Sequence, residues 1–210
     1  MIFKDRIEAA NLLADKLETY RGKNAIILAV PRGGVPMGYI IAKQLSLPLE
    51  VVLSKKIGHP LHKEFAIGAV TLKSQVLSEA AKEVSKSYIE EETKKIRTLL
   101  TKRYQDYYGN KKPQELKDNI LIIVDDGVAT GNTIISTIQM LHDEQPEKIV
   151  VAIPVSSQSA LQKLQNSAFI DDVICITAPT NFRAVGQFYQ NFDQVDDIEV
   201  KALLNKETVA

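Results

Sequence analysis

ILIIVDDGVATGNT, residues 120–133, joins an apolar run to two acids and a glycine-containing loop. Residues 120–124 are all aliphatic, which is typical of a strand buried on both faces of a sheet. The pattern from Asn132 to His142 predicts a helix directly after the loop. In open α/β sheets, ligands bind beyond the carboxyl ends of the strands. This stretch therefore predicts an α/β fold and marks where a ligand would bind.

Outward from this stretch, apolar runs alternate with helical patterns. Their order predicts the α/β fold class, a parallel sheet with helices on both faces. The expected strands are 24–30, 49–53, 120–124, 148–155 and 172–177, with a further strand at 66–72 that could belong to a β-ribbon. The expected helices are 5–20, 37–45, 132–142, 158–165 and 198–204.

The chain, residues 1–210, is expected to form a single domain with two additions. The polar segment 55–65 is expected to be a loop. Residues 78–108 are rich in Glu and Lys and contain no Gly or Pro, so they predict a long helix within an insertion over 78–113. One apolar stripe on that helix suits either a surface helix or a contact in a homodimer. The aromatic segment 178–210 is expected to form a small hood and tail.

The overall charge excludes some classes of partner. The chain has 26 basic and 26 acidic residues, a net charge of zero, so no field over the whole molecule attracts nucleic acid or a membrane. No apolar stretch approaches the ~18 residues that a membrane helix needs. Cys175 is the single cysteine, which fits a reducing compartment, and we expect a cytoplasmic protein.

The loop after residues 120–124 has the chemistry of a site for a phosphorylated sugar. Glycine lets the backbone approach a ligand, and the start of a helix attracts an anion such as phosphate. Asp125 and Asp126 would repel phosphate, so they suit ribose hydroxyls or a divalent cation held through water. The alternative is an ordinary helix-capping turn with solvated acids. The spacing matches neither a P-loop nor a dinucleotide-binding turn.

A second segment with similar chemistry follows the first expected strand. In Val30-Pro31-Arg32-Gly33-Gly34 the arginine offers a fork for phosphate oxygens, and the glycines free backbone N–H groups. The alternative is a Gly-Gly turn beside a surface arginine. Lys55 and Lys56 end the next strand, and for them a solvated pair is equally consistent.

Together these motifs resemble the type I phosphoribosyltransferases. The resemblance implies a reaction of 5-phosphoribosyl 1-pyrophosphate (PRPP) and Mg²⁺ with a nitrogen nucleophile, usually a nucleobase. It implies catalytic roles for Asp125, Asp126, Arg32 and Lys55. The implied phosphoribose site is Asp125, Asp126, Gly127, Val128, Ala129, Thr130, Gly131, Asn132 and Thr133. The implied pyrophosphate site is Arg32, Gly33, Gly34, Lys55 and Lys56, in a loop that often contains a strained or cis peptide. Asp125 and Asp126 are the implied metal-binding residues.

Ala129 departs from one branch of this family. Members that act on 6-oxopurines usually have an aspartate at this position, so hypoxanthine or guanine is disfavoured and the adenine-type pattern is closer. The wider pattern resembles a bacterial group of predicted phosphoribosyltransferases whose acceptor is unassigned. It includes VPRGGVPMG at 30–38, EFAIGAV at 64–70 and AVGQFY at 184–189.

The remaining signals leave alternatives open. Phe182 or Tyr189 could stack on an acceptor base, or pack the hood. His59 and His62 flank Pro60, so a loop over the site is favoured over zinc. The whole chain could also be a non-catalytic sensor that binds PRPP or a nucleotide, or a domain that acts on a different phosphorylated sugar.

Overall fold

The computed structural model describes residues 1–109 and 111–206. Its centre is a five-stranded sheet in the order β2-β1-β6-β7-β8, with every neighbouring pair parallel. The strands are β1 (Ala25–Ala29), β2 (Leu49–Val51), β6 (Ile120–Val124), β7 (Lys148–Val155) and β8 (Asp172–Thr177). The predicted parallel α/β sheet is confirmed.

Alternate residues of each strand face opposite layers of helices. Ile27 and Ile122 pack toward α1 (Arg6–Lys16) and α2 (Gly34–Leu45), while Leu28 and Ile123 pack toward α4 (Asn132–His142) and α5 (Gln158–Gln165). Because both faces are covered, the strands are apolar throughout instead of alternating. A short 3₁₀ turn, η1 (Glu18–Tyr20), connects α1 to β1.

The second helix starts earlier than expected, at Gly34 and not at Met37. Pro36 lies in its first turn, where a missing N–H costs nothing because that group would have no partner in the helix. The helix therefore begins immediately at the loop 31–33, and this loop lies at the carboxyl edge of the sheet.

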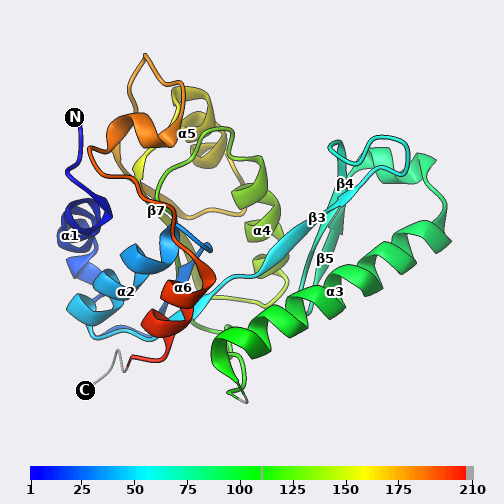
Figure 1. Cartoon of the computed structure of the whole chain (residues 1–210), viewed down its shortest axis with the longest axis horizontal. Coiled ribbons are helices and arrows are strands. Elements are labelled where there is room, and N and C mark those ends of the chain that lie inside the picture. Colours follow the sequence, from blue (N-terminus) through cyan, green and yellow to red (C-terminus); the bar gives the residue numbers. More distant parts are fainter. Residues whose placement is uncertain (110, 207–210) are drawn as a thin grey trace.

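An arm projects from the core beside α4 (Figure 1). It contains an antiparallel sheet of β3 (Ser54–Gly58), β4 (Ala66–Thr71) and β5 (Gln75–Leu77), then the 3₁₀ turn η2 (Glu79–Glu83) and the helix α3 (Lys86–Tyr108). The arm starts before the expected 78–113 insertion, of which residue 110 is outside the described part. The expected loop 55–65 is partly wrong, since Ile57 of β3 is fully buried in a cluster that continues from the arm to Val35 and Val51.

The long helix begins at Lys86 because Ser85 caps it. The Ser85 Oγ accepts a hydrogen bond from the Tyr88 N–H at 3.4 Å. The arm is joined to α4 by a hydrogen bond between the Ser54 and Thr137 hydroxyls at 2.8 Å and by a Lys73–Glu144 ion pair at 3.3 Å.

The two ends of the chain close over the core from one side. The Phe3 N–H donates to the Phe188 carbonyl at 2.8 Å, next to the 3₁₀ turn η3 (Val185–Phe188). The last helix, α6 (Asp197–Leu204), packs against α2 and α3 (Figure 1). It confirms the helix expected near 198–204, while residues 207–210 of the expected tail lie outside the described part. Within residues 1–109 and 111–206, no helix is long and apolar enough to cross a membrane.

Candidate functional site

Asp125 and Asp126 lie at the carboxyl edge, in the middle of the sheet. The preceding residue, Val124, is in register with Ala29 of β1 and Ala152 of β7. The Asp126 N–H donates to Asp125 Oδ1 at 2.8 Å. Burial and the charge of Asp126 raise the pKa of Asp125 well above its usual value. The ionised form of this partly buried pair is therefore disfavoured, and hydroxyl donors or a hard cation such as Mg²⁺ would stabilise it.

The loop after the acids is fixed at its base and exposed at its tip. The Val128 N–H donates to Val155 at 2.9 Å, and the Ser157 hydroxyl donates to the Ala129 carbonyl at 2.7 Å. Gly131 has a φ of 76°, a left-handed conformation that favours glycine. Ala129, Thr130, Asn132 and Thr133 are exposed, so the start of α4 is open to an anion.

The loop 31–34 touches the acids directly. The Pro31–Arg32 peptide bond is cis. A Cβ on Gly33 would lie 1.9 Å from Asp126 Oδ2, and one on Gly34 would lie 2.5 Å from the Val124 carbonyl oxygen. Only glycine fits at either position. The structure thus brings together the two segments that the sequence predicted to bind pyrophosphate and ribose.

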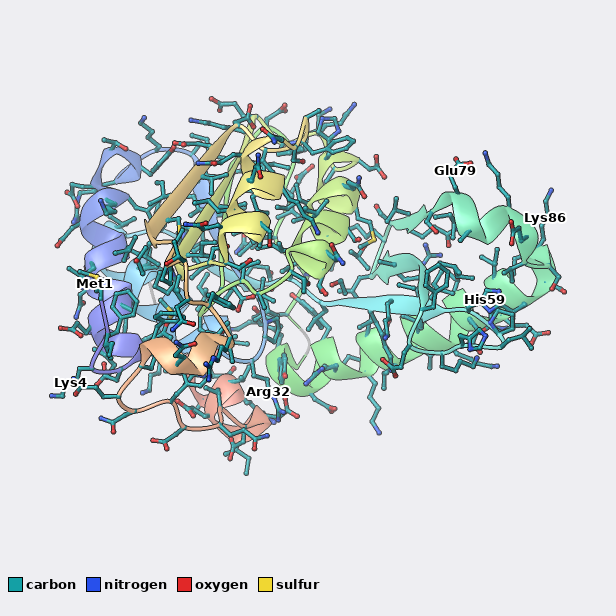
Figure 2. The ribbon with its side chains drawn as sticks, turned by 90° about the horizontal axis from the view of Figure 1, so that it is seen from above. Met1, Lys4, Arg32, His59, Glu79 and Lys86 are labelled. Carbon is teal, nitrogen blue, oxygen red and sulfur yellow. The ribbon has the colours of Figure 1, made fainter. Side chains whose placement is uncertain are left out.

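Arg32 lies near α6 (Figure 2). Hydrogen bonds from Tyr107 and Arg103 lower the pKa of Asp197 at the start of α6, and the nearby charge of Arg32 adds to this effect. Arg32 is partly exposed and therefore accessible to a ligand at the carboxyl edge.

Arg6 is a site residue that the sequence analysis missed. Its Nε donates a hydrogen bond to Asp126 Oδ2 at 2.9 Å, and its Nη2 forms an ion pair with the same oxygen at 2.8 Å. Burial raises the pKa of Asp126, and Arg6 opposes this by lowering it. The sequence contained one signal for this role, an arginine in the first turn of a helix. The positive end of the helix dipole disfavours an arginine there unless another group stabilises its charge.

Lys163 was also missed. Its ammonium approaches the Thr130 carbonyl and Asn132 Oδ1 at 3.5 and 3.4 Å. Because the nitrogen lies beside the exposed loop tip, it can supply a positive charge to a phosphate bound there. Its place on α5 is more than thirty residues from the loop, so motif spacing could not reveal it.

The two aromatic residues predicted to bind an acceptor differ in exposure. Tyr189 is buried between Phe3 and Phe192, with ring centroids at 5.4 and 4.8 Å, and its hydroxyl donates to the Asp126 carbonyl at 2.6 Å. This ring has a packing role and positions the acid. Phe182 is partly exposed and stacks on Phe188, so base stacking by Phe182 stays a prediction.

Lys55 and Lys56 belong to the arm. Both are exposed on β3, and Lys56 pairs with Glu64 at 2.7 Å. With Lys63, Lys95 and Glu92 they line a cavity of about 280 Å³. Figure 2 shows the arm extending away from Arg32 toward His59. Within the described residues, no hydrogen bond or ion pair joins either lysine to Arg6 or the two acids, so their role stays a prediction.

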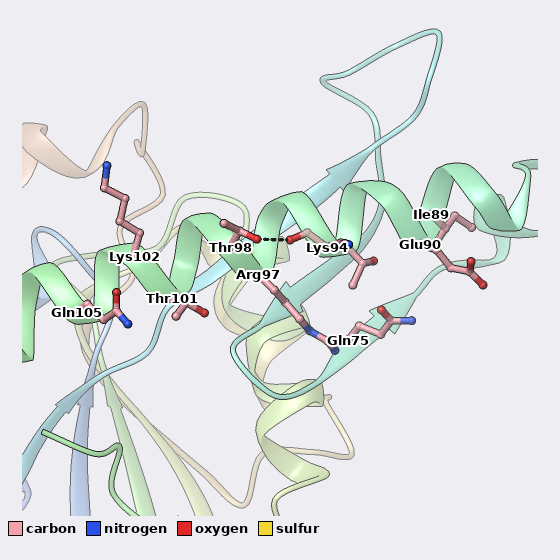
Figure 3. Close-up of a pocket in the computed structure, with 10 residues that line it drawn as sticks. Gln75, Ile89, Glu90, Lys94, Arg97, Thr98, Thr101, Lys102 and Gln105 are labelled. Atoms are coloured by element: carbon pink, nitrogen blue, oxygen red, sulfur yellow. Dashed lines mark hydrogen bonds between the residues drawn. The ribbon is translucent and has the colours of Figure 1, made fainter. Parts of the chain in front are cut away.

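A groove of about 640 Å³ runs along α3 on the arm (Figure 3). The residues that line it, such as Glu90, Lys94 and Lys102, include none of those predicted to bind substrate. No group of three or more His, Cys, Asp and Glu side chains suited to a metal gathers within residues 1–109 and 111–206. The two carboxylates at the sheet edge have the oxygen donors that Mg²⁺ prefers, and Mg²⁺ binding there stays a prediction.

Comparison with known proteins agrees with this geometry. The family described as "Phosphoribosyl transferase domain" matches residues 3–192. A Mycobacterium tuberculosis protein named "Putative phosphoribosyl transferase Rv0571c" is 33% identical over 98% of this chain. The alignment covers 47% of that protein, so the chain spans about half the length of this curated relative.

Solved structures give the same fold. The protein TT1426 from Thermus thermophilus is 36% identical, with a TM-score of 0.86 over 97% of this chain and 98% of that one. A hypothetical protein from Neisseria gonorrhoeae with bound ppGpp is 14% identical, with a TM-score of 0.52 over 97% of both chains. The second likeness concerns the fold alone.

Proposed function

Because this chain belongs to the phosphoribosyl transferase domain family, we propose that it transfers phosphoribose from PRPP to a nitrogen acceptor, with Mg²⁺ as cofactor. The acceptor would be a nucleobase or a related heterocycle. A cytoplasmic location and a homodimer are further predictions of this proposal.

One observation supports this proposal above the others, namely the contact between Gly33 and Asp126. PRPP carries its pyrophosphate on the ribose, so a site for it needs a pyrophosphate loop against a ribose-binding acid. The exposed loop 129–133 at the start of α4 suits the 5-phosphate, with Lys163 beside it. Three adjacent subsites thus match the three parts of one donor molecule.

The charges suit cleavage of the bond between ribose C1 and pyrophosphate. Positive charge grows on the ribose ring, where Asp125 and Asp126 oppose it. Negative charge grows on the leaving pyrophosphate, where Arg32 and the N–H groups of Gly33 and Gly34 stabilise it. Mg²⁺ held by the two acids through water would neutralise pyrophosphate oxygens. Lys55 and Lys56 remain predicted contributors.

The acceptor is constrained only in part. Ala129 supplies no carboxylate to a purine N7, which disfavours hypoxanthine and guanine. The exposed tip of the loop and the partly exposed ring of Phe182 leave room for a flat heterocycle.

Release of pyrophosphate from PRPP, screened against a panel of nucleobases with Mg²⁺, tests the proposal. Turnover with at least one base is the expected result. Saturable binding of PRPP without turnover on any acceptor would instead support a sensor that binds PRPP and regulates a partner.

The Arg32→Ala variant tests the leaving-group assignment. We expect it to weaken binding of PRPP and pyrophosphate on the order of tenfold or more, because charge-assisted bonds to phosphate are lost. Binding of a nucleoside monophosphate, which has no pyrophosphate, should change much less. Equal losses for both ligand classes in calorimetric titrations would contradict the assignment.

A further inference from the structure

Arg6, on the N-terminal helix, holds Asp126 in place, and each of its three guanidinium nitrogens has a polar contact. The Arg6 Nε donates to Asp126 Oδ2, Nη2 forms an ion pair with the same oxygen, and Nη1 donates to the Asp193 carbonyl at 2.8 Å. The guanidinium also lies over the ring of Phe192, 3.9 Å from its centroid. The Arg6 side chain is only 12% exposed, which sets it apart from ordinary surface ion pairs.

The contacts fix the orientation of the Asp126 carboxylate. Arg6 binds Oδ2 from one side, and Gly33 lies against the same oxygen from another, since a Cβ there would be 1.9 Å away. The Tyr189 hydroxyl holds the Asp126 main-chain carbonyl at 2.6 Å. The ion pair engages Oδ2 and leaves Oδ1 outside it, so one oxygen anchors the group while the other can serve a ligand.

Charge gives a second reason for an arginine at this place. Asp125 and Asp126 are adjacent carboxylates in a partly buried setting, where like charges repel strongly. Two charged side chains face Asp126. The Asp125 carboxylate repels the negative charge of Asp126, and the Arg6 guanidinium attracts it. Without Arg6, nothing on this side would hold the carboxylate against turning toward water, and a fixed acceptor would be lost.

We propose that Arg6 is a positioning residue for the ribose subsite, which holds Asp126 so that the carboxylate accepts hydrogen bonds from the ribose hydroxyls. This inference rests on the proposed function and adds the N-terminal helix to its site. Arg6 acts through Asp126, and the Phe192 ring helps to position the Arg6 guanidinium. Neither Arg6 nor Phe192 needs to touch the substrate.

The test measures binding of PRPP and of pyrophosphate, each with Mg²⁺, by calorimetry on the full chain. Arg6→Ala should weaken PRPP binding about tenfold or more, the usual effect of removing a residue that orients a ligand-binding group. Binding of pyrophosphate should fall much less, because pyrophosphate has no ribose and would meet the acids only through Mg²⁺. Arg6→Lys should recover part of the loss, because it restores the charge without the planar fork.

Matched variants separate this role from general destabilisation. Arg21→Ala removes an exposed arginine that pairs with Glu18 at 2.6 Å, away from the acids, and should bind PRPP like the wild type. Arg6→Gln keeps donors without charge and serves if Arg6→Ala does not fold. Adding Arg6→Ala to Asp126→Asn should weaken PRPP binding no further than Asp126→Asn alone.

Provided that the wild type and Arg21→Ala bind PRPP, either of two results would overturn the inference. In the first, Arg6→Ala binds PRPP as tightly as the wild type or more tightly, which would make Arg6 irrelevant or a blocking contact. In the second, PRPP and pyrophosphate lose affinity by the same factor. Failure of the folded wild type to bind PRPP would overturn both the inference and the proposed function.

Discussion

At the residue scale, the binding role proposed for Asp125 and Asp126 carries an energetic cost. Burial and the neighbouring charge raise the pKa of Asp125, so its ionised form is less favourable in the folded protein than in the unfolded chain. Ribose hydroxyls and Mg²⁺ would relieve this cost when they bind. The ligand-free site is thus destabilised in favour of the ligand-bound one.

Asp125→Asn should therefore stabilise the ligand-free protein. Removing the unfavourable charge should contribute on the order of 1 kcal/mol, which is about 2–4 °C in Tm for a domain of this size. The measurement is thermal unfolding at neutral pH in EDTA, so that no divalent cation offsets the charge. A lower Tm for the variant would contradict this account.

The same carboxyl predicts the pH dependence of stability. Its folded pKa is above the unfolded value of 3.8, so between these values the folded state binds more protons. The contribution of Asp125 to stability in EDTA should therefore fall as pH rises above about 4 through the raised pKa. Asp125→Asn should flatten this slope in melts from pH 4 to pH 8. An unchanged slope would mean that Asp125 is not its source.

Gly33→Ala tests the contact between the two loops. The added Cβ would meet Asp126 Oδ2 and displace either the loop or the acid, at a cost of about 1–3 kcal/mol in unfolding free energy. PRPP binding should fall sharply. Gly22→Ala is the control, because Gly22 has a φ of +69° but open space around it. It should lose some stability through backbone strain and retain PRPP binding.

Sequence alone could reveal the acids and the glycines, because each belongs to a short local motif beside a strand. It could not reveal Arg6, because the partners Arg6 and Asp126 lie 120 residues apart and meet only after the ends of the chain fold over the sheet. Tyr189 shows the reverse case. Its aromatic character is visible in the sequence, but its burial between Phe3 and Phe192 depends on the tertiary structure.

At the scale of elements, the core was predictable and the arm only in part. The core strands are continuous apolar runs, a pattern that burial on both faces requires. The strand β3 reads Ser-Lys-Lys-Ile-Gly, and β5 has only three residues, so neither shows a clear alternation. Their pairing with β4 and packing under α3 decide their structure, and such long-range contacts override local propensity.

The helix α3 is fastened at both ends by tyrosine hydroxyls. Tyr107 donates to Asp197 of α6, and Tyr88 donates to the Gly58 carbonyl at 2.8 Å near the arm's tip. Tyr107→Phe should cost about 1 kcal/mol and speed amide hydrogen exchange in α6. Tyr88→Phe should speed exchange near Gly58 and leave α6 unchanged. Identical exchange patterns for the two variants would contradict separate anchoring.

At the scale of the whole molecule, the fold brings distant segments to one edge of the sheet. Loops 31–34 and 125–133 follow adjacent strands, the N-terminal helix supplies Arg6, and the segment after η3 supplies Tyr189. The arm extends to one side of this cluster (Figure 1). A ligand that spans ribose, 5-phosphate and pyrophosphate would contact each of the two loops.

The most direct test of a PRPP site is calorimetric titration of PRPP, with Mg²⁺, into the wild type and into the Asp125→Asn, Asp126→Asn double variant. We predict saturable binding by the wild type and a large loss of affinity in the double variant, which should still unfold cooperatively. Equal affinity in the two proteins, or no binding by the folded wild type, would contradict the assignment of Asp125 to Thr133 as the phosphoribose site.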